Sequence, residues 1–466
     1  MQKVFTHIGF LDEKCYSKYN LSEDILMEHA ALALKNAIKK ESKEYNSSIL
    51  ICCGVGNNAA DGITLARLLQ NEYKNIYLYI PFEVKSSMAK LQLQRANLLG
   101  IKQINNISSI NKVDIVVDCL FGSGLNKSLD KTTIEIIEKL NNIEAFKISC
   151  DIPSGIDVNG KIETCAFIAH KTVTMGANKL ALFTDIVKDY VGKIEVANLG
   201  LAKEMYEEET DIFLLEQTDM KLPFRKQKNS HKGTFGHAAI VIGCKKGAGT
   251  IACDAAFSFG SGLVTAIVHE ELALPCHIMQ SHKLPLNTTS IAIGMGLGLY
   301  NQDELKQILD NNIAKVIDAD MFYEEIILQH LKSNVVLTPH PKEFCSLLKL
   351  TKIADISIEE LQNNRFKYLK EFTLKYPQVT ILLKGANTLI ANNNKIFINY
   401  FGTSVLSKGG SGDVLSGLIA SLLAQGYSSL DAAITASLAH TLVAKKYKKN
   451  SYSLSPQDLI EGIKIL

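Results

Sequence analysis

The sequence predicts an α/β protein with two domains, each built around a sheet of parallel strands. Its 466 residues exceed one ordinary domain, since domains commonly hold about 100–200 residues. Short apolar segments that end in Gly, Pro or Asp alternate with helix-like segments, and this rhythm stops near the middle and then restarts. Strands that are apolar throughout and alternate with helices are typical of parallel sheets covered on both faces.

The first half predicts a helix followed by a series of buried strands. The helix is expected over residues 22–40, where Ser22 is suited to cap the start and lysines lie near the end. The segment at 63–73, ITLARLLQNEY, is also predicted to be helical. Four strands are expected, each ending at turn residues: SILICCGVG, NIYLYIP, VDIVVDCLFGSG and AFKISCDIPSG.

The second half repeats the rhythm with HAAIVIG, SIAIGMGLG, KVIDAD, NVVLTPHP and TILLKGANTLIA. A last apolar helix, LIASLLAQG, follows the glycine-rich stretch SKGGSGDVLSG. Between the halves lies a charged segment without strand rhythm, which places the boundary near Asp211 to Pro223. The expected domains are therefore residues 1–212 and 220–466.

The amino-acid composition indicates which kind of ligand the protein binds. Lys plus Arg number 50 and Asp plus Glu number 48, so no broad field favours nucleic acid or an anionic membrane, and small molecules are expected instead. The 10 cysteines are scattered without a CxxC pair, which fits buried thiols in a reducing compartment. The N-terminus lacks a signal-peptide pattern and no apolar stretch is long enough to span a membrane. A cytoplasmic protein is expected.

Three polar loops follow strands of the first half: GVGNNAADG (54–62), DCLFGSGLNKS (118–128) and DIPSG (151–155). Ligands of open parallel sheets bind beyond the carboxyl ends of the strands. Glycines there let backbone N–H groups approach an anion, while amide, hydroxyl and carboxylate oxygens suit a hard cation. The same residues also fit ordinary turns and helix caps, so each loop taken alone leaves both interpretations open.

With these motifs, residues from about 19 to 201 resemble the epimerase domain of the bifunctional NAD(P)H-hydrate repair enzymes, whose loops read G-x-G-N-N-G-G-D-G, D-x-L-x-G-T-G-L and D-I-P-S-G. The resemblance implies a Rossmann-like, doubly wound fold. It implies that the R and S forms of hydrated NADH and NADPH (NADHX and NADPHX) interconvert at C6, with Asp151 as the acid or base. Ala59 and Ala60 replace two glycines of the family pattern, and MEHA replaces its MENAG.

The resemblance also implies two sets of binding residues in this half. The potassium ligands would be Asn58, Asp118 and Ser154. The hydrated nucleotide would be contacted by Asn57, Asn58, Ala59, Ala60, Asp61, Gly122, Ser123, Gly124, Leu125, Asn126, Lys127, Ser128 and Asp151.

In the second half, the stretch SKGGSGDVLSG opens an apolar helix. Several backbone N–H groups at a helix start form an anion hole, which stabilises charge that develops during phosphoryl transfer. Asp413 at this turn is suited to accept the proton of a hydroxyl that attacks the phosphate. The alternative is that Asp413 only caps the helix.

Further motifs stand at other strand ends: HKGTFG (231–236), GMGLG (294–298), VIDAD (316–320), TPHPKEF (338–344) and LKGANT (383–388). His340 lies between two prolines directly after a strand, although a lone histidine is more often an ordinary surface or core residue. Asp318 and Asp320 are suited to magnesium or to a structural role, and a structural role is expected for at least one.

From about residue 224 to 466, these motifs resemble the ribokinase-like dehydratase domain of the same enzymes. That domain phosphorylates the C6 hydroxyl of S-NAD(P)HX using ADP, accompanied by Mg²⁺, so that phosphate leaves, AMP remains and the double bond is restored. Met295 and Lys342 depart from the family pattern. The resemblance implies that the hydrated cofactor contacts Ala248, Gly296, His340 and the catalytic Asp413, and that ADP contacts Lys384, Gly385, Ala386, Asn387, Thr388 and Gly412.

The predicted function is the repair of NADHX and NADPHX by an epimerase and an ADP-dependent dehydratase in one chain, expected to form a homo-oligomer. One alternative is a ribokinase-like small-molecule kinase whose N-terminal part only binds a nucleotide for regulation. A dinucleotide-dependent dehydrogenase is disfavoured because Ala59 occupies the third glycine position of G-x-G-x-x-G, and because that motif would not explain Asn57, Asn58 and Asp61.

Overall fold

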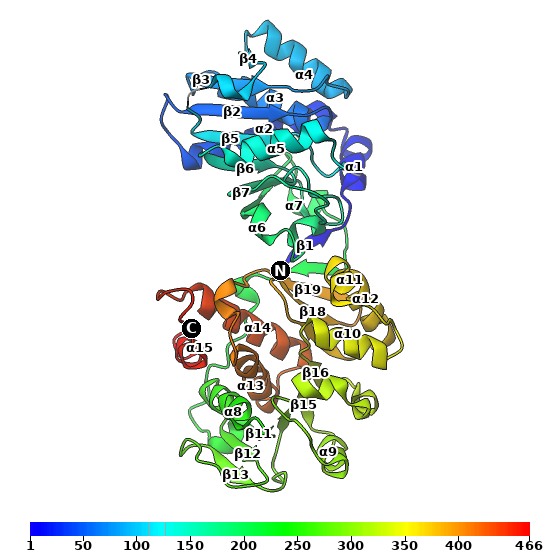
Figure 1. The fold of residues 1–466 in the computed structure, drawn as a ribbon, viewed down its shortest axis with the longest axis vertical. Helices are drawn as coiled ribbons and strands as arrows, with labels where there is room; N and C mark the ends of the chain where they lie inside the picture. Colours follow the sequence, from blue (N-terminus) through cyan, green and yellow to red (C-terminus); the bar gives the residue numbers. More distant parts are fainter. Residues whose placement is uncertain (111, 126) are drawn as a thin grey trace. The chain divides into compact units, whose positions relative to one another are not determined.

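The computed structural model describes residues 1–110, 112–125 and 127–466, and the chain divides into two compact units (Figure 1). The N-terminal unit is Lys3–Thr210, and the C-terminal unit is Asp211–Leu466 together with Met1–Gln2. Strand β10 (Ile212–Leu214) pairs with β19 (Lys395–Asn399), so the chain enters the second sheet directly after Asp211.

The N-terminal unit holds a parallel seven-stranded sheet in the order β4-β3-β2-β5-β6-β7-β9. Strand order reverses between β2 and β5, which makes the loops after these two strands the walls of a crevice where ligands of such sheets bind. The four expected strands are confirmed as β2, β3, β5 and β6, whereas β7 and β9 were not predicted because polar residues interrupt their apolar pattern. The strands are β2 (Ser48–Cys53), β3 (Asn75–Tyr79), β4 (Gln103–Ile104), β5 (Ile115–Cys119), β6 (Phe146–Cys150), β7 (Lys171–Met175) and β9 (Lys193–Ala197).

Helices cover both faces of this sheet. Alternate β2 residues, Ile49 and Ile51, pack in one core with helices α2 (Glu23–Glu41), α3 (Asn57–Leu69) and α4 (Ser87–Leu98). Leu50 and Cys52 point to the other face, against α5 (Lys131–Asn142). The predicted cap is confirmed, since the Ser22 side chain accepts a hydrogen bond from the Ile25 N–H. Smaller elements are β1 (Gln2–Phe5), which pairs with β8 (Asn178–Lys179), and α1 (Gly9–Tyr19), η1 (Ile107–Ser109), η2 (Leu180–Phe183), α6 (Lys188–Val191) and α7 (Lys203–Tyr206).

The sheet of the C-terminal unit runs in the order β13-β12-β11-β14-β15-β16-β17-β18-β19-β10. It is mixed, which corrects the expectation of a parallel sheet, because β18 pairs antiparallel with β17 and with β19. The turn at residues 384–387 is too short for a crossover, so TILLKGANTLIA folds back as two strands. The strands are β11 (His237–Val241), β12 (Leu263–Ile267), β13 (Met279–Ser281), β14 (Ser290–Ile293), β15 (Ala314–Ile317), β16 (Val335–Leu337), β17 (Thr380–Leu383) and β18 (Thr388–Asn392).

One helix is the centre of this unit. Helix α13 (Ser411–Ala424) is buried from Val414 to its end and shares a core with α8 (Lys246–Ser258), α14 (Ser429–Lys445) and α15 (Pro456–Ile463). Its burial on all sides explains why the sequence LIASLLA carries no polar face. The remaining elements are η3 (Gln217–Asp219), η4 (Lys232–Phe235), α9 (Gln302–Leu309), η5 (Ala319–Tyr323), η6 (Glu325–His330), α10 (Pro341–Leu350), α11 (Ile358–Asn363), α12 (Arg365–Lys375) and η7 (Ser404–Leu406).

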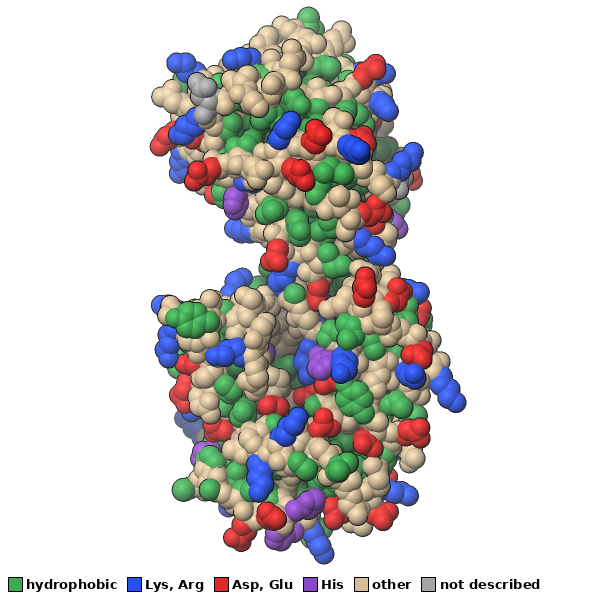
Figure 2. Space-filling model, in the orientation of Figure 1, with side chains coloured by type: hydrophobic (Ala, Val, Ile, Leu, Met, Phe, Trp, Pro, Cys, Tyr) green, Lys and Arg blue, Asp and Glu red, His purple; other side chains and the backbone are tan. Residues whose placement is uncertain are grey.

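The surface agrees with the balanced composition. Basic and acidic side chains are interspersed over the face of the molecule in Figure 2. None of the helices in the described part of the chain is both long enough and apolar enough to cross a membrane.

Candidate active sites

The first candidate site lies at the crevice of the N-terminal sheet, where the three predicted potassium ligands converge. The Asn58 amide donates to the Phe121 carbonyl at 2.8 Å, and the Ser154 hydroxyl lies 3.4 Å from the same oxygen. The Ser154 hydroxyl also donates to Asp118 at 2.6 Å. Residues that are far apart in the sequence thus place hydroxyl, carbonyl and carboxylate oxygens side by side, with the Asn58 amide adjoining them.

Asp118 is the charged member of this group. It is fully buried at the end of β5, and burial raises its pKa to about 6, although hydrogen bonds from Ser154 and Leu120 partly offset that effect. Hydrogen bonds, not a cationic side chain, compensate the carboxylate. A buried carboxylate surrounded by neutral oxygens is the donor set that a hard cation such as K⁺ prefers, so these residues fit the ion.

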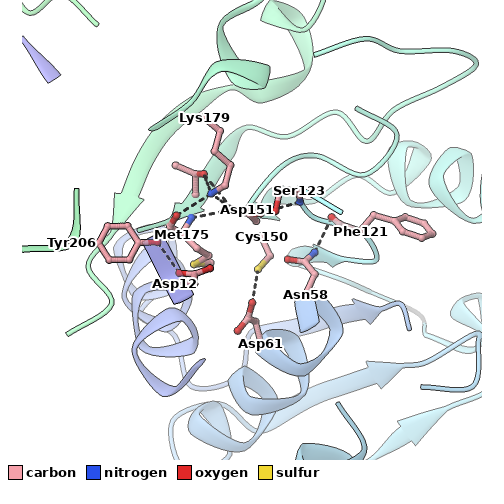
Figure 3. A network of polar contacts seen from close by, with 11 residues as sticks. Asp12, Asn58, Asp61, Phe121, Ser123, Cys150, Asp151, Met175, Lys179 and Tyr206 are labelled. Atoms are coloured by element: carbon pink, nitrogen blue, oxygen red, sulfur yellow. Dashed lines mark hydrogen bonds and ion pairs between the residues drawn. The ribbon is translucent and has the colours of Figure 1, made fainter. Parts of the chain in front are cut away.

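Asp151 forms the centre of a second network (Figure 3). Its Oδ1 accepts hydrogen bonds from the Met175 N–H at 3.1 Å and from the Lys179 ammonium at 2.5 Å. Its Oδ2 accepts one from the Ser123 N–H at 3.1 Å. Burial opposes ionisation, but Lys179 and the N–H donors hold the pKa of Asp151 below its ordinary value. Asp151 is therefore an ionised carboxylate at neutral pH.

The backbone of Asp151 is strained. Its φ of 69° lies in the left-handed region, which is uncommon for residues other than glycine. Such conformations persist where surrounding contacts enforce them, and they cluster at functional sites. Gly122 lies close by, since a Cβ atom there would come within 3.0 Å of Asp151 Oδ2 and 3.2 Å of Asn58 Oδ1.

Two further carboxyl groups surround Lys179. Burial and repulsion by Asp151 and Asp12 raise the pKa of Asp61 well above its ordinary value. Burial also raises the pKa of Asp12, which accepts a hydrogen bond from the Tyr206 hydroxyl at 2.8 Å. Sequence reasoning missed Asp12, Lys179 and Tyr206. Only Lys179 had a usable signal, because it comes shortly after the strand pattern KTVTM, at the end of the segment GANK.

The other predicted residues of this site differ in accessibility. Ala59 and Ala60 are fully buried in the core at the start of α3, and their N–H groups donate to the Gly56 carbonyl, so neither residue presents a free surface to a ligand. Asn57 is exposed and donates to Glu23 instead of turning toward Asp151. Asn126 lies outside the described residues. The exposed members of the glycine loop are Ser123, Gly124, Lys127 and Ser128, with Leu125 half-buried.

The second candidate site is the start of α13. Gly410 precedes the helix with φ 89°, and no side chain caps it, so Asp413 is not a helix cap. Asp413 is half-buried in the first turn, and burial together with the charge of Asp318 raises its pKa, while Lys384 opposes the shift. In Figure 2 the C-terminal unit is hollowed over the region where Figure 1 labels α13, β15 and β16, with charged side chains at the rim.

Lys384, which is partly exposed, and the buried Asp318 form an ion pair beside this turn. Lys384 Nζ lies 2.9 Å from Asp318 Oδ1, and Ser416 of α13 donates to Asp318 Oδ2 at 2.6 Å. Burial alone would lower the pKa of Lys384, but Asp318 and Glu343 raise it above its ordinary value. A Cβ at Gly412 would lie 3.7 Å from Lys384 Nζ, so this fixed positive charge borders the anion hole. Asp318 therefore has the structural role expected for one of the two aspartates, and Asp320 accepts from the Gly298 N–H at 2.9 Å.

The predicted nucleotide loop is the turn between β17 and β18. Gly385 and Ala386 are exposed at its tip, whereas Asn387 and Thr388 are buried. The buried Arg365 of α12 donates to the carbonyls of Asn387, Leu383 and Lys384 at 3.0–3.2 Å, which fixes the loop's shape. The sequence offered no signal for Arg365, because a lone arginine in a helix is usually a surface residue.

Two of the residues predicted to contact the hydrated cofactor, Gly296 and Ala248, lie side by side in the structure. A Cβ at Gly296 would lie 3.3 Å from the Ala248 side chain, so these two residues are neighbours. His340 caps α10, since its Nδ1 accepts from the N–H groups of Lys342 and Glu343. His340 therefore has a structural contact through Nδ1, and its Nε2 lies 3.1 Å from Glu343, whose pKa burial raises to about 7. Its contact with the hydrated cofactor stays a prediction.

Two protein families match the chain. The family described as YjeF-related protein N-terminus matches residues 23–181, and the family described as NAD(P)H-hydrate dehydratase matches residues 238–464. The bifunctional NAD(P)H-hydrate repair enzyme Nnr of Helicobacter pylori is 43% identical over 480 residues, which cover 100% of both chains. The enzyme of that name from Coxiella burnetii is 31% identical over 483 residues, with 97% of each chain covered. A solved structure of the ADP/ATP-dependent NAD(P)H-hydrate dehydratase from Bacillus subtilis, co-crystallised with ATP/Mg²⁺, is 25% identical with a TM-score of 0.41, and covers 51% of this chain and 91% of its own.

Proposed function

Because the chain belongs to the family of bifunctional NAD(P)H-hydrate repair enzymes, we propose that each unit carries one of the two activities. Lys3–Thr210 is the epimerase of R- and S-NAD(P)HX, and Asp211–Leu466 is the ADP-dependent dehydratase of the S form. The observation that carries the proposal is the convergence of Asp413, Gly412 and Lys384 at the start of α13. That arrangement is suited to transferring a phosphoryl group, not only to holding one.

The dehydratase reaction follows from these groups. The C6 hydroxyl of S-NADHX attacks the β-phosphorus of ADP, Asp413 accepts the hydroxyl proton, and AMP leaves. The N–H groups at the start of α13 and the charge of Lys384 stabilise the negative charge on the transferred phosphoryl group. Mg²⁺ carried with the nucleotide shields the phosphate charge. Phosphate then departs from C6 as the ring nitrogen donates its electron pair, which leaves an iminium ion, and loss of a proton from C5 to water restores the double bond of NADH.

The epimerase reaction uses the ring nitrogen in the same way. Loss of the C6 oxygen gives a planar ring, and oxygen that returns to the other face inverts the centre. Asp151 Oδ2, bordered by Gly122, is the group placed to take and return the proton of the water that is exchanged. A K⁺ ion held by Asn58, Asp118 and Ser154 would supply positive charge that orders the loop at Phe121.

The test adds ADP and Mg²⁺ to the purified full chain with a mixture of R- and S-NADHX, and follows the reduced-nicotinamide absorbance. Recovery of all the absorbance is expected, because epimerisation feeds the S form to the dehydratase. Recovery limited to the S fraction would remove the epimerase from the proposal. No recovery with ADP or ATP would contradict the dehydratase and favour a kinase that releases a phosphorylated product.

The cellular location and the oligomeric state are predictions made from the sequence alone. The scattered cysteines favour a cytoplasmic location. The homo-oligomer stays a prediction, which light scattering of the purified chain would test.

A further inference from the structure

A second hollow of about 190 Å³ opens at the carboxyl ends of β11, β12 and β14, and no activity is yet assigned to it. Its floor is apolar and is formed by the buried side chains of Ile242, Val268 and Leu297. Its rim is polar and carries Lys246 and Glu270, whose charged groups lie 3.5 Å apart. An apolar floor with a few polar groups at the rim is the usual build of a small-molecule site.

The walls of this hollow are preformed. The Cys244 N–H donates to the Leu297 carbonyl at 3.1 Å, and the Lys245 N–H donates to the Gly296 carbonyl at 3.0 Å, so two loops are joined as a pair. On the opposite side, Gln280 bonds both the N–H and the carbonyl of Leu272, at 2.9 and 2.8 Å. A ligand therefore meets a fixed shape, which lowers the entropy lost on binding.

One wall presents a flat aromatic surface. The rings of His269 and Tyr300 are stacked with centroids 4.7 Å apart, and Glu304 fixes the histidine through its Nε2 at 2.8 Å. Planar bases bind to such surfaces by stacking, because every base has an aromatic face. Leu299 at the same hollow is 97% exposed, so apolar surface remains to be covered.

The hollow adjoins the proposed substrate contacts. Gly296 lies in one of the two paired loops of its wall, and Ala248 lies in the first turn of α8, directly after the other, so a ligand that touches Gly296 can continue into the hollow. Whole drug-sized ligands occupy pockets of about 300–1,000 Å³, so a hollow of about 190 Å³ suits one end of a dinucleotide rather than all of it. The adenine ring and its ribose are the end that lies away from the reacting nicotinamide.

We propose that the hollow between residues 242–246, 268–272 and 297–300 binds the adenosine half of the hydrated dinucleotide while its nicotinamide half reacts at Asp413. The inference rests on the proposed dehydratase function and extends it to the rest of the substrate. The adenine stacks on the His269–Tyr300 wall, and Lys246 at the start of α8 faces the pyrophosphate.

Glu270 then influences which dinucleotide is preferred. It lies at the rim of the hollow after β12, where its carboxylate is placed to accept a hydrogen bond from a ribose hydroxyl. A 2′-phosphate at this position would be repelled by the carboxylate. The dehydratase is therefore expected to have a higher kcat/KM for S-NADHX than for S-NADPHX.

The first test needs no turnover. Cys244 lines the hollow and is exposed, and Cys276 is exposed without lining it, so the two thiols form a matched pair. The full chain is treated with iodoacetamide, with and without NADH, and the alkylation of each cysteine is followed by mass spectrometry. NADH is expected to slow alkylation of Cys244 and not of Cys276. Equal alkylation rates at Cys244 with and without saturating NADH would overturn the proposal.

The second test uses kinetics with ADP held saturating. Tyr300→Leu is expected to raise KM for both substrates by about tenfold, the loss typical of one base-stacking surface, with kcat unchanged. Glu270→Gln is expected to bring the kcat/KM ratio of the two substrates toward one. Glu271→Gln is the matched control, because Glu271 is the adjacent exposed carboxylate and does not line the hollow.

These tests separate the two proposals. Dehydration that is insensitive to Tyr300→Leu and Glu270→Gln would overturn the adenosine site and leave the dehydratase intact. Protection of Cys244 by NADH in a chain that dehydrates neither substrate would support the site and contradict the proposed function.

Discussion

At the scale of single residues, both candidate sites use the same electrostatic device. A lysine, the buried Lys179 or the partly exposed Lys384, pairs with one aspartate, and another carboxyl group nearby has a raised pKa. The paired aspartates, Asp151 and Asp318, have lowered pKa values despite their burial. Carboxyl groups within one site thereby have pKa values shifted in opposite directions, and such a separation is typical of acid–base sites.

Asp413→Asn is expected to lower the dehydration rate by about a thousandfold, the typical contribution of a general base. ADP binding should be retained, because the nucleotide loop and Gly412 are unchanged, and calorimetric titration of ADP checks this point. In the wild-type enzyme, the rate should fall as the pH drops through the raised pKa of Asp413, since only the ionised carboxylate accepts a proton. Normal turnover in the variant would remove Asp413 from the mechanism.

Asp151→Asn should abolish the exchange between R- and S-NADHX while dehydration of the S form continues. The physical reason is that the amide can neither accept the proton nor balance the charge of Lys179. The exchange is measured by chromatography of the two forms without ADP. An unchanged exchange rate would contradict the role of Asp151.

Asp118 is expected to make the stability of the fold depend on pH and on K⁺. Its pKa rises from 3.8 to about 6 on folding, so its favourable contribution is complete below pH 3.8 and is lost as the pH rises through 6. A K⁺ ion at this carboxylate favours the ionised form, so it should stabilise the fold mainly above pH 6. KCl is expected to raise Tm by about 3 °C over equal NaCl at pH 8 and hardly at pH 5.

The control for this prediction is Asp118→Asn, in which the difference between the two salts should disappear at both pH values. Equal Tm values of the wild type in KCl and NaCl at pH 8 would argue against a K⁺ site at Asp118.

At the scale of elements, the glycine loop after β5 lies so close to Asp151 and Asn58 that a side chain at Gly122 would crowd both residues. A Cβ at Gly122 would press on Asp151 Oδ2 and Asn58 Oδ1, whereas one at Gly124 would meet nothing within 4 Å. Gly122→Ala is therefore expected to slow epimerisation by about tenfold or more, because small displacements of catalytic groups are costly. Gly124→Ala is the matched control and should retain the rate. Similar rates in the two variants would show that the approach of Gly122 is not needed.

At the scale of the whole molecule, the division into two compact units predicts that a ligand protects only the unit that binds it. ADP with Mg²⁺ is expected to slow hydrogen exchange at residues 384–388 and 410–413, because ligand binding protects the segments that it contacts. Residues 54–62 and 122–125 should keep their exchange rates. Protection by ADP in the N-terminal unit, measured peptide by peptide in the full chain, would contradict the assignment of ADP to the C-terminal unit.

The sequence by itself determined the alternation of strands and helices and the chemistry of the loops that follow the strands. The helix start at Ser22 and the strands around Cys52, Asp118 and Cys150 depend on nearby residues, so local pattern suffices for them. The types of side chain at each strand end, such as the carboxylate of Asp118 and the hydroxyl of Ser154, can also be read locally.

Only the tertiary structure decided which of these groups meet. Lys179 reaches Asp151 because β7 lies beside β6, and Arg365 supports the nucleotide loop from a different helix. Strand β18 runs antiparallel because the preceding turn is short, and His269 finds Tyr300 across two loops. Contacts between distant residues depend on strand order and burial, which the packing of the whole chain fixes and a local pattern does not encode.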